Sequence, residues 1–183
     1  EPIPTCAITM DAGKVIVDSA VRNVGTIQVS SEFKAGPFMS DFSSWGPMPD
    51  LQLKPEISAH GGEITSAVPG GYDIYSGTSM AAPNMAGAIS LLRQYLKTAN
   101  PELTGPELNA RVNQVLMSTA TIALNEEGNP YSPRKQGAGL AGIADAIGTE
   151  SYITVKDENG NVRDKTKIEL YDDKTRTGVY EFE

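Results

Sequence analysis

The stretch from residue 80 to 92 is apolar or small almost without interruption. A helix of this composition has no polar face, so we expect it to be buried on most sides. The longest apolar stretch, around Met85 to Leu92, is far shorter than the roughly 20 residues of a membrane span. Pro83 falls in the first turn, where a missing amide hydrogen costs little. The pattern predicts a helix from Ser79 to Lys97 inside a globular domain.

The residues around this helix alternate between β-rich and helical patterns. Short β-rich segments are predicted at 39–44, 56–59, 63–68 and 72–75. A second helix begins after Thr104, because Thr104 and Glu107 have the spacing of a capping box. Its apolar positions share one face and are Leu108, Val112, Val115 and Leu116. With a third helix at 140–147, this alternation favours an α/β domain.

The two ends of the chain differ from this body. Residues 1–35 contain a possible strand at 7–9, a short helix at 11–18 and another strand at 26–30. Charged residues number 24 in positions 1–150 and 14 in the 33 positions after them. That tail has β-rich runs at 152–155, 168–171 and 179–183, and Asn159-Gly160 is a strong hairpin-turn signal. We therefore divide the chain at 35 and 150, although the tail could also be an appendage of the main domain.

Composition excludes several functions. The net charge is −8 and no basic run offsets it, which argues against nucleic-acid binding. Cys6 is the single cysteine, so there is no internal disulfide framework. His60 is the single histidine, so a mechanism with a histidine base must use it or take one from elsewhere. No Ca²⁺-loop pattern is present, and we predict no cofactor and no catalytic metal.

One heptapeptide, Gly77 to Pro83, could carry chemistry. A glycine turn follows a β-rich segment there, and Ser79 opens the long helix. A helix N-terminus has unpaired amide hydrogens and the positive end of the dipole. These groups could stabilise the oxyanion that forms when a serine attacks a carbonyl group. The alternative is that Ser79 or Thr78 is only a helix N-cap.

The sequence Gly-Thr-Ser-Met-Ala-x-Pro at 77–83 resembles the nucleophile motif of the subtilisin-like serine proteases. Phe-Ser-Ser-Trp-Gly-Pro at 42–47 and Lys-Pro-Glu-Ile-Ser-Ala at 54–59 are similar to two further elements of that family. Ser-Pro-Arg-Lys-Gln-Gly-Ala-Gly at 132–139 is similar to a segment of the Gram-positive cell-envelope proteinases, the lactocepin group. The resemblance covers residues 38–149 well.

This resemblance implies an organisation for the whole chain. Residues 36–149 would be the C-terminal part of a subtilisin-like catalytic domain with a parallel sheet. Residues 1–35 would be the end of an inserted protease-associated domain and a linker, and 150–183 would begin a β-sandwich module of the fibronectin type. The resemblance also implies a secreted or cell-wall-associated protein that cleaves polypeptides through an acyl-enzyme on Ser79.

The chain departs from the family pattern in its catalytic motifs. Neither the aspartate motif nor the histidine motif of the family is present, and neither is its oxyanion asparagine. His60 stands where the family has the proline of Ala-Pro-Gly, so we interpret it as a turn or surface residue. Asn84 is interpreted as a polar residue of helix packing. We therefore expect this chain to be part of a longer protein whose remaining catalytic domain supplies the histidine and aspartate.

Without that remainder we predict negligible peptidase activity, because a serine hydroxyl needs a base to take its proton. Exposed sheet edges and apolar helix surface would favour self-association of the chain. Two alternatives remain open. The parent could be a pseudoprotease that serves as a cell-surface binding or structural module, or a small esterase whose base is His60.

Overall fold

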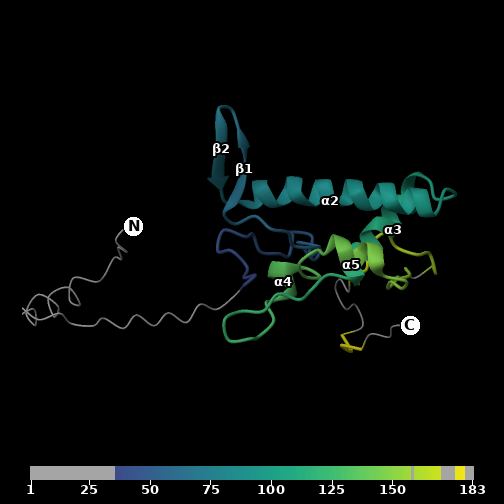
Figure 1. Cartoon of the computed structure of the whole chain (residues 1–183). Helices are drawn as coiled ribbons and strands as arrows, with labels where there is room; N and C mark the ends of the chain where they lie inside the picture. Colours follow the sequence, from purple (N-terminus) through teal and green to yellow (C-terminus); the bar gives the residue numbers. More distant parts are fainter. Residues whose placement is uncertain (1–35, 158, 170–175, 180–183) are drawn as a thin grey trace, which may run out of the picture. The chain divides into compact units, whose positions relative to one another are not determined.

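The computed structural model of the chain describes residues 36–157, 159–169 and 176–179. The chain divides into two units at residues 35 and 36, and the described residues all belong to the second. Its elements follow in the order β1, β2, α2, α3, α4 and α5 (Figure 1). The strands and helix expected within residues 1–35 lie outside the described residues.

Two strands form a hairpin immediately before the long helix. β1 (Ile64–Val68) and β2 (Gly71–Tyr75) pair antiparallel, with Ile64 opposite Tyr75. Every residue of β2 is exposed, and Figure 1 shows the hairpin extending away from α2. The β-rich patterns at 63–68 and 72–75 predicted both strands to within one residue.

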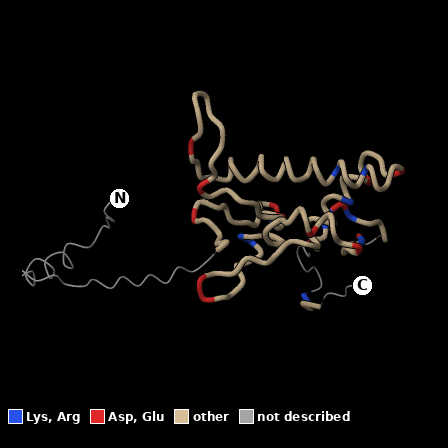
Figure 2. The backbone as a smooth tube through the Cα atoms, in the orientation of Figure 1, with Lys and Arg blue, Asp and Glu red and all other residues tan. Residues whose placement is uncertain are grey.

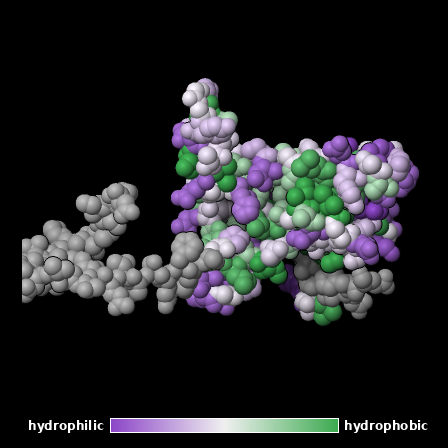
Figure 3. All heavy atoms as spheres, in the orientation of Figure 1, coloured by the Kyte–Doolittle hydropathy of each residue, from purple (hydrophilic) through white to green (hydrophobic). Residues whose placement is uncertain are grey.

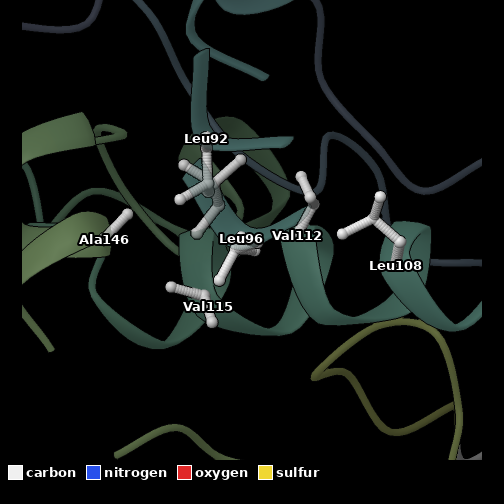
Figure 4. Packing of buried hydrophobic residues seen from close by; sticks show 7 residues of the cluster. Leu92, Leu96, Leu108, Val112, Val115 and Ala146 are labelled. Atoms are coloured by element: carbon white, nitrogen blue, oxygen red, sulfur yellow. The ribbon is translucent and has the colours of Figure 1, made fainter. Parts of the chain in front are cut away.

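A small hydrophobic core joins three helices. α2 (Thr78–Ala99) contributes Leu92 and Leu96, α3 (Gly105–Ser118) packs beneath it, and α5 (Ile143–Gly148) contributes Ala146 (Figure 4). The apolar face predicted for the second helix is this core surface; its residues are Leu108, Val112, Val115 and Leu116. The predicted N-cap is also confirmed, although the Thr104 side chain makes no capping hydrogen bond.

The expectation that α2 is buried on most sides is wrong for this structure. Only Leu92 and Leu96 of this helix are buried. Leu91 and Tyr95 are 59% and 44% exposed, and hydrophobic atoms are visible on the surface over α2 (Figure 3). The reason is that α3 and α5 cover one side of the helix and loop segments such as Gly61 contact its first turns, while other sides have no cover from the described residues.

Extended segments meet beside these helices without forming a continuous sheet. Ser58 makes a parallel bridge to Leu140, and Leu140 makes an antiparallel bridge to Thr121. Gly139 permits this approach, because a Cβ atom there would collide with the carbonyl oxygen of Thr121. The expected parallel sheet is therefore reduced, in the part of the chain described, to this one parallel bridge. The strand predicted at 39–44 is absent, since that segment is turn and coil.

Two shorter elements complete the body. α4 (Pro133–Gln136) is a single turn that the sequence pattern did not predict, and Ser132 caps it by accepting a hydrogen bond from the amide of Arg134. The third predicted helix begins at Ile143 instead of residue 140. Its start is delayed because the amide of Ala141 donates to the carbonyl oxygen of Ser58, which keeps that residue extended.

The tail after residue 150 is mostly irregular where the structure describes it. Lys156 and Val162 form one antiparallel bridge around the predicted Asn159-Gly160 turn. The run at 152–155 is not a strand, and neither are residues 168 and 169 of the next run; the remaining β-rich positions lie outside the described residues, apart from Val179. Gln114 of α3 holds the tail by donating a 2.8 Å hydrogen bond to the carbonyl oxygen of Arg163.

Candidate active site

Ser79 is the second residue of α2 and its side chain is exposed. Helix geometry leaves the first amide groups of α2 without intrahelical partners. No hydrogen bond from the amide of Thr78 or Ser79 occurs in the described part of the chain. The first turn also contains no acidic residue that would oppose an incoming negative charge. The exposed Ser79 side chain thus lies beside an amide without a hydrogen-bond partner among the described residues, at the positive end of a 22-residue helix.

Backbone contacts fix the turn that precedes Ser79. The amide of Gly77 donates to the carbonyl oxygen of Gly61 at 2.8 Å, and the carbonyl oxygen of Gly77 accepts from the amide of Met80 at 3.0 Å. Gly61 is buried against this turn, since a Cβ atom on it would lie 2.7 Å from the carbonyl oxygen of Gly77. The helix entry therefore depends on a glycine sixteen positions before the turn, which the motifs alone did not identify.

A second contact closes the base of the hairpin. The hydroxyl of Ser76 accepts a 2.8 Å hydrogen bond from the amide of Glu63. Together with the Gly61–Gly77 bond, it fastens both ends of the segment that contains β1 and β2. Ser79 consequently follows a hairpin whose base is fixed even though its strands are exposed.

A cleft of about 450 Å³ lies beside the start of α2. The helix contributes Thr78, Ala81, Ala82 and Met85 to its wall. The opposite wall is formed mainly by segments 37–43 and 55–62. Most of these side chains are apolar or small, so the cleft offers a surface for a polypeptide or a packed protein segment and few polar anchors.

The structure places His60 in the wall of this cleft, next to Gly61, whose carbonyl oxygen fixes the amide of Gly77. Its side chain is exposed, as expected for a turn or surface residue. No hydrogen bond or ion pair from the imidazole to a carboxylate occurs among the described residues. The ring therefore lacks, within that part of the chain, the carboxylate partner that orients a catalytic histidine. Asn84 is exposed on α2 and does not line the cleft.

The other motifs meet one another in space. The amide of Gly46 donates to the carbonyl oxygen of Arg134 at 2.8 Å, and the Arg134 Nε returns a 2.9 Å bond to the carbonyl oxygen of Gly46. The amide of Ser58 donates to the carbonyl oxygen of Gly139 at 2.8 Å. These contacts join three segments into one framework: 42–47, 54–59 and 132–139. The segment 54–59 continues along the chain to Gly61.

Buried and charged groups stabilise this framework. Gln136 is 3% exposed; its Oε1 accepts from the amide of Ala123 at 2.7 Å and its Nε2 donates to the carbonyl oxygen of Tyr131 at 2.6 Å. Burial opposes ionisation of Glu56, but hydrogen bonds and attraction from Lys165 and Lys54 outweigh it and lower the pKa of this residue to about 2.

The described residues contain no group of three or more His, Cys, Asp or Glu side chains arranged to hold a metal ion. Within the same part of the chain, no helix combines the length and the apolar character that crossing a bilayer requires.

Comparison with known proteins relates these motifs to one family. Residues 9–139, more than half of the chain, match the family model described as Peptidase_S8, Subtilase family. This match begins inside the segment 1–35 that the sequence pattern separated from the catalytic part.

Three curated relatives share long alignments with the chain. The C5a peptidase of Streptococcus pyogenes is 39% identical over 179 residues, covering 92% of this chain and 15% of the relative. The minor extracellular protease Vpr of Bacillus subtilis is 33% identical over 187 residues, covering 92% of this chain and 22% of the relative. The PII-type proteinase of Lactococcus lactis subsp. cremoris is 41% identical over 134 residues, covering 67% of this chain and 7% of the relative.

The chain therefore spans less than a quarter of the length of each of these relatives. The residues matched by the family model, 9–139, include the motif around Ser79 and the three segments of the framework described above. The chain belongs to the subtilase family.

Proposed function

We propose that this chain carries the nucleophile of a secreted or cell-wall-associated subtilisin-like serine endopeptidase, and that the nucleophile is Ser79. The observation that supports this most strongly is the exposed Ser79 hydroxyl at the start of a long helix, inside the Gly77–Pro83 motif. The names of the relatives, which include an extracellular protease and a PII-type proteinase, support the same class of activity.

In the proposed reaction, Ser79 Oγ attacks the carbonyl carbon of a peptide bond. The hydroxyl proton moves to a base, and the carbonyl oxygen becomes a tetrahedral oxyanion. The amide of Ser79 and the positive end of α2 stabilise this developing negative charge. Collapse of the intermediate breaks the C–N bond while the protonated base gives its proton to the leaving amine; water then hydrolyses the acyl-enzyme and restores the Ser79 hydroxyl.

This reaction needs a histidine base, and the single histidine of the sequence is His60. His60 has no described carboxylate to orient it, and the chain has neither the aspartate motif nor the histidine motif of the family. We infer that a further part of the catalytic domain supplies both residues. The apolar wall of the cleft and the exposed side of α2 are surfaces against which that part could pack.

The domain assignment remains part of this proposal. Residues 36–149 are the C-terminal part of the catalytic domain, preceded by the end of a protease-associated domain and followed by the start of a fibronectin-like module. The substrate class is polypeptide, and no cofactor is needed for the serine chemistry.

The experiment compares the natural full-length gene product with this 183-residue chain. A fluorophosphonate probe labels only a serine that a base activates. We expect rapid labelling of the full-length protein at Ser79, confirmed by peptide mass, and negligible labelling of the isolated chain. Ser79→Ala should abolish labelling, whereas Ser90→Ala, an exposed serine on the same helix, should leave it unchanged.

Labelling of neither protein would contradict the enzyme proposal and would support the alternative, a pseudoprotease that acts as a cell-surface binding or structural module. Rapid labelling of the isolated chain would contradict the inference that the base comes from another part of the protein.

A further inference from the structure

Lys135 is a buried lysine with no carboxylate partner among the described residues. The residue is 7% exposed, although it lies in the single turn of α4. Its Nζ lies 5.4 Å from the centroid of the Trp45 ring and 5.3 Å from that of the Tyr131 ring. Two aromatic faces therefore hold the ammonium group by cation–π attraction. We call Trp45, Tyr131, Arg134 and Lys135 the cationic–aromatic cluster.

The charges of this cluster are uncompensated within the described part of the chain. Neither Lys135 nor Arg134 takes part in an ion pair there, and Lys135 Nζ makes no hydrogen bond. The basic pair is visible at the position of α4 in Figure 2. By contrast, Lys54, Lys165 and Lys167 all contact the carboxylate of Glu56. Among the cations of the described residues that lack an ion pair, Lys135 stands out because its side chain is buried.

The cluster is also held in place before any ligand arrives. The two hydrogen bonds between Gly46 and Arg134 attach the segment of Trp45 to α4. Gln136 donates to the carbonyl oxygen of Tyr131, which fixes the second aromatic residue beside the same turn. Preorganised groups of this kind lose little conformational entropy when a ligand binds.

We propose that the cationic–aromatic cluster is a binding site for a carboxylate side chain of an acidic polypeptide segment. The three N–H donors of Lys135 make no hydrogen bond to the described residues, and a carboxylate oxygen is an acceptor that would also neutralise the charge. Arg134 adds a second cation next to it. Trp45 is 58% exposed and offers an apolar surface to the neighbouring residues of the segment. A nucleic acid fits less well, because the net charge of the protein repels a long polyanion.

Trp45 makes the proposal directly measurable, because it is the single tryptophan of the chain. We would titrate the chain with a blocked Gly-Glu-Glu-Gly peptide and follow tryptophan fluorescence. A saturable change is expected, and the matched Gly-Gln-Gln-Gly peptide should give none. Inorganic phosphate should act at least about tenfold more weakly, since it presents no polypeptide backbone to the Trp45 surface.

Variants test which cation is responsible. Lys135→Met preserves the buried aliphatic stem and removes the charge, so it should lower the affinity for the Glu peptide at least about tenfold. Arg134→Gln should weaken binding of the Glu peptide by a smaller factor. This variant also tests the proposal if Lys135→Met does not fold. Lys156→Gln, an exposed lysine outside the cluster, should bind as the parent does. Equal responses to the Glu and Gln peptides, no response to either, or equal affinity for phosphate would overturn the proposal.

Discussion

The amide of Gly77 and the carbonyl oxygen of Gly61 are joined by a 2.8 Å hydrogen bond, two residues before the proposed nucleophile. This bond links the turn at the start of α2 to the segment that runs from Glu56 to Gly61. That segment is itself bonded to residues 138 to 141 through Glu56 and Ser58. The position of Ser79 therefore depends on packing far from it in sequence, and not only on its own motif.

We expect Gly61→Ala to disturb the start of α2. The new Cβ atom would lie 2.7 Å from the carbonyl oxygen of Gly77 and 3.0 Å from the Cβ of Ala81. Relief of that overlap requires the turn to move, which should cost about 1–3 kcal/mol of folding free energy. Urea unfolding of the chain measures this loss, and fluorophosphonate labelling of the full-length protein should fall as well.

Gly87→Ala is the matched control for this substitution. Gly87 lies within α2, and outside the backbone of that helix no heavy atom of the described residues lies within 4 Å of the position that a Cβ atom would take. Alanine should therefore stabilise the helix by up to about 1 kcal/mol. If both substitutions gave the same change in unfolding free energy, close packing at Gly61 would not be the cause.

His60 lines the cleft beside Thr78, so its role can be tested directly. Because no described carboxylate orients its ring, we expect His60→Ala in the full-length protein to leave the rate of fluorophosphonate labelling unchanged. A loss comparable with that of Ser79→Ala would identify His60 as the base and support the esterase alternative. Circular dichroism of the variant would show whether such a loss came from unfolding.

Local patterns were sufficient to predict the elements that depend on local physics. The two strands β1 and β2, the helix α2 and the buried face of α3 follow from β-rich segments, a glycine turn and apolar spacing at positions such as Leu108 and Val112, whereas the antiparallel pairing of the strands was not predicted. The burial of α2 was overestimated, because composition gives the hydrophobic character of a face but not whether a partner covers it.

Contacts between distant segments could not be predicted in the same way. Nothing in the single sequence relates Gly61 to Gly77, Trp45 to Lys135, or Gln136 to Ala123. Each pair depends on a tertiary approach that leaves no periodic signal. The α4 turn was missed for a similar reason, since a four-residue helix is too short to show a hydrophobic period.

Gln136 should be essential for the framework around the cluster. Gln136→Leu replaces the amide side chain by an apolar one of similar size. It leaves the amide of Ala123 and the carbonyl oxygen of Tyr131 without their present partner. An unsatisfied buried group costs about 1–3 kcal/mol, and because the amide of Ala123 is buried while the Tyr131 carbonyl is partly buried, we expect a loss of folding free energy of about that size. Gln94→Leu, on the exposed side of α2, is the control substitution. If Gln136→Leu lowered the free energy of unfolding as little as Gln94→Leu, the two hydrogen bonds of Gln136 would contribute little.

Ion pairs around Glu56 attach the tail after residue 150 to the rest of the described chain. The free energy of unfolding should therefore depend on pH. Glu56 contacts Lys54 on its own segment and Lys165 of the tail, the latter at 2.8 Å. The pKa of Glu56 is about 2 in the folded chain, below its ordinary value near 4.5. A carboxyl with a lowered pKa stabilises the folded state fully above the ordinary value, and the contribution disappears as pH falls toward 2.

We therefore expect Glu56→Gln to cost about 1–2 kcal/mol at pH 7, a figure reduced for partial solvent screening, and almost nothing at pH 2. Urea unfolding at both pH values measures the difference between variant and parent. Glu102→Gln, an exposed carboxylate outside the ion pairs of the described residues, should show no such dependence on pH. A Glu56→Gln penalty of the same size at both pH values would mean that side-chain packing, and not the charge on Glu56, holds the tail against residues 53–56.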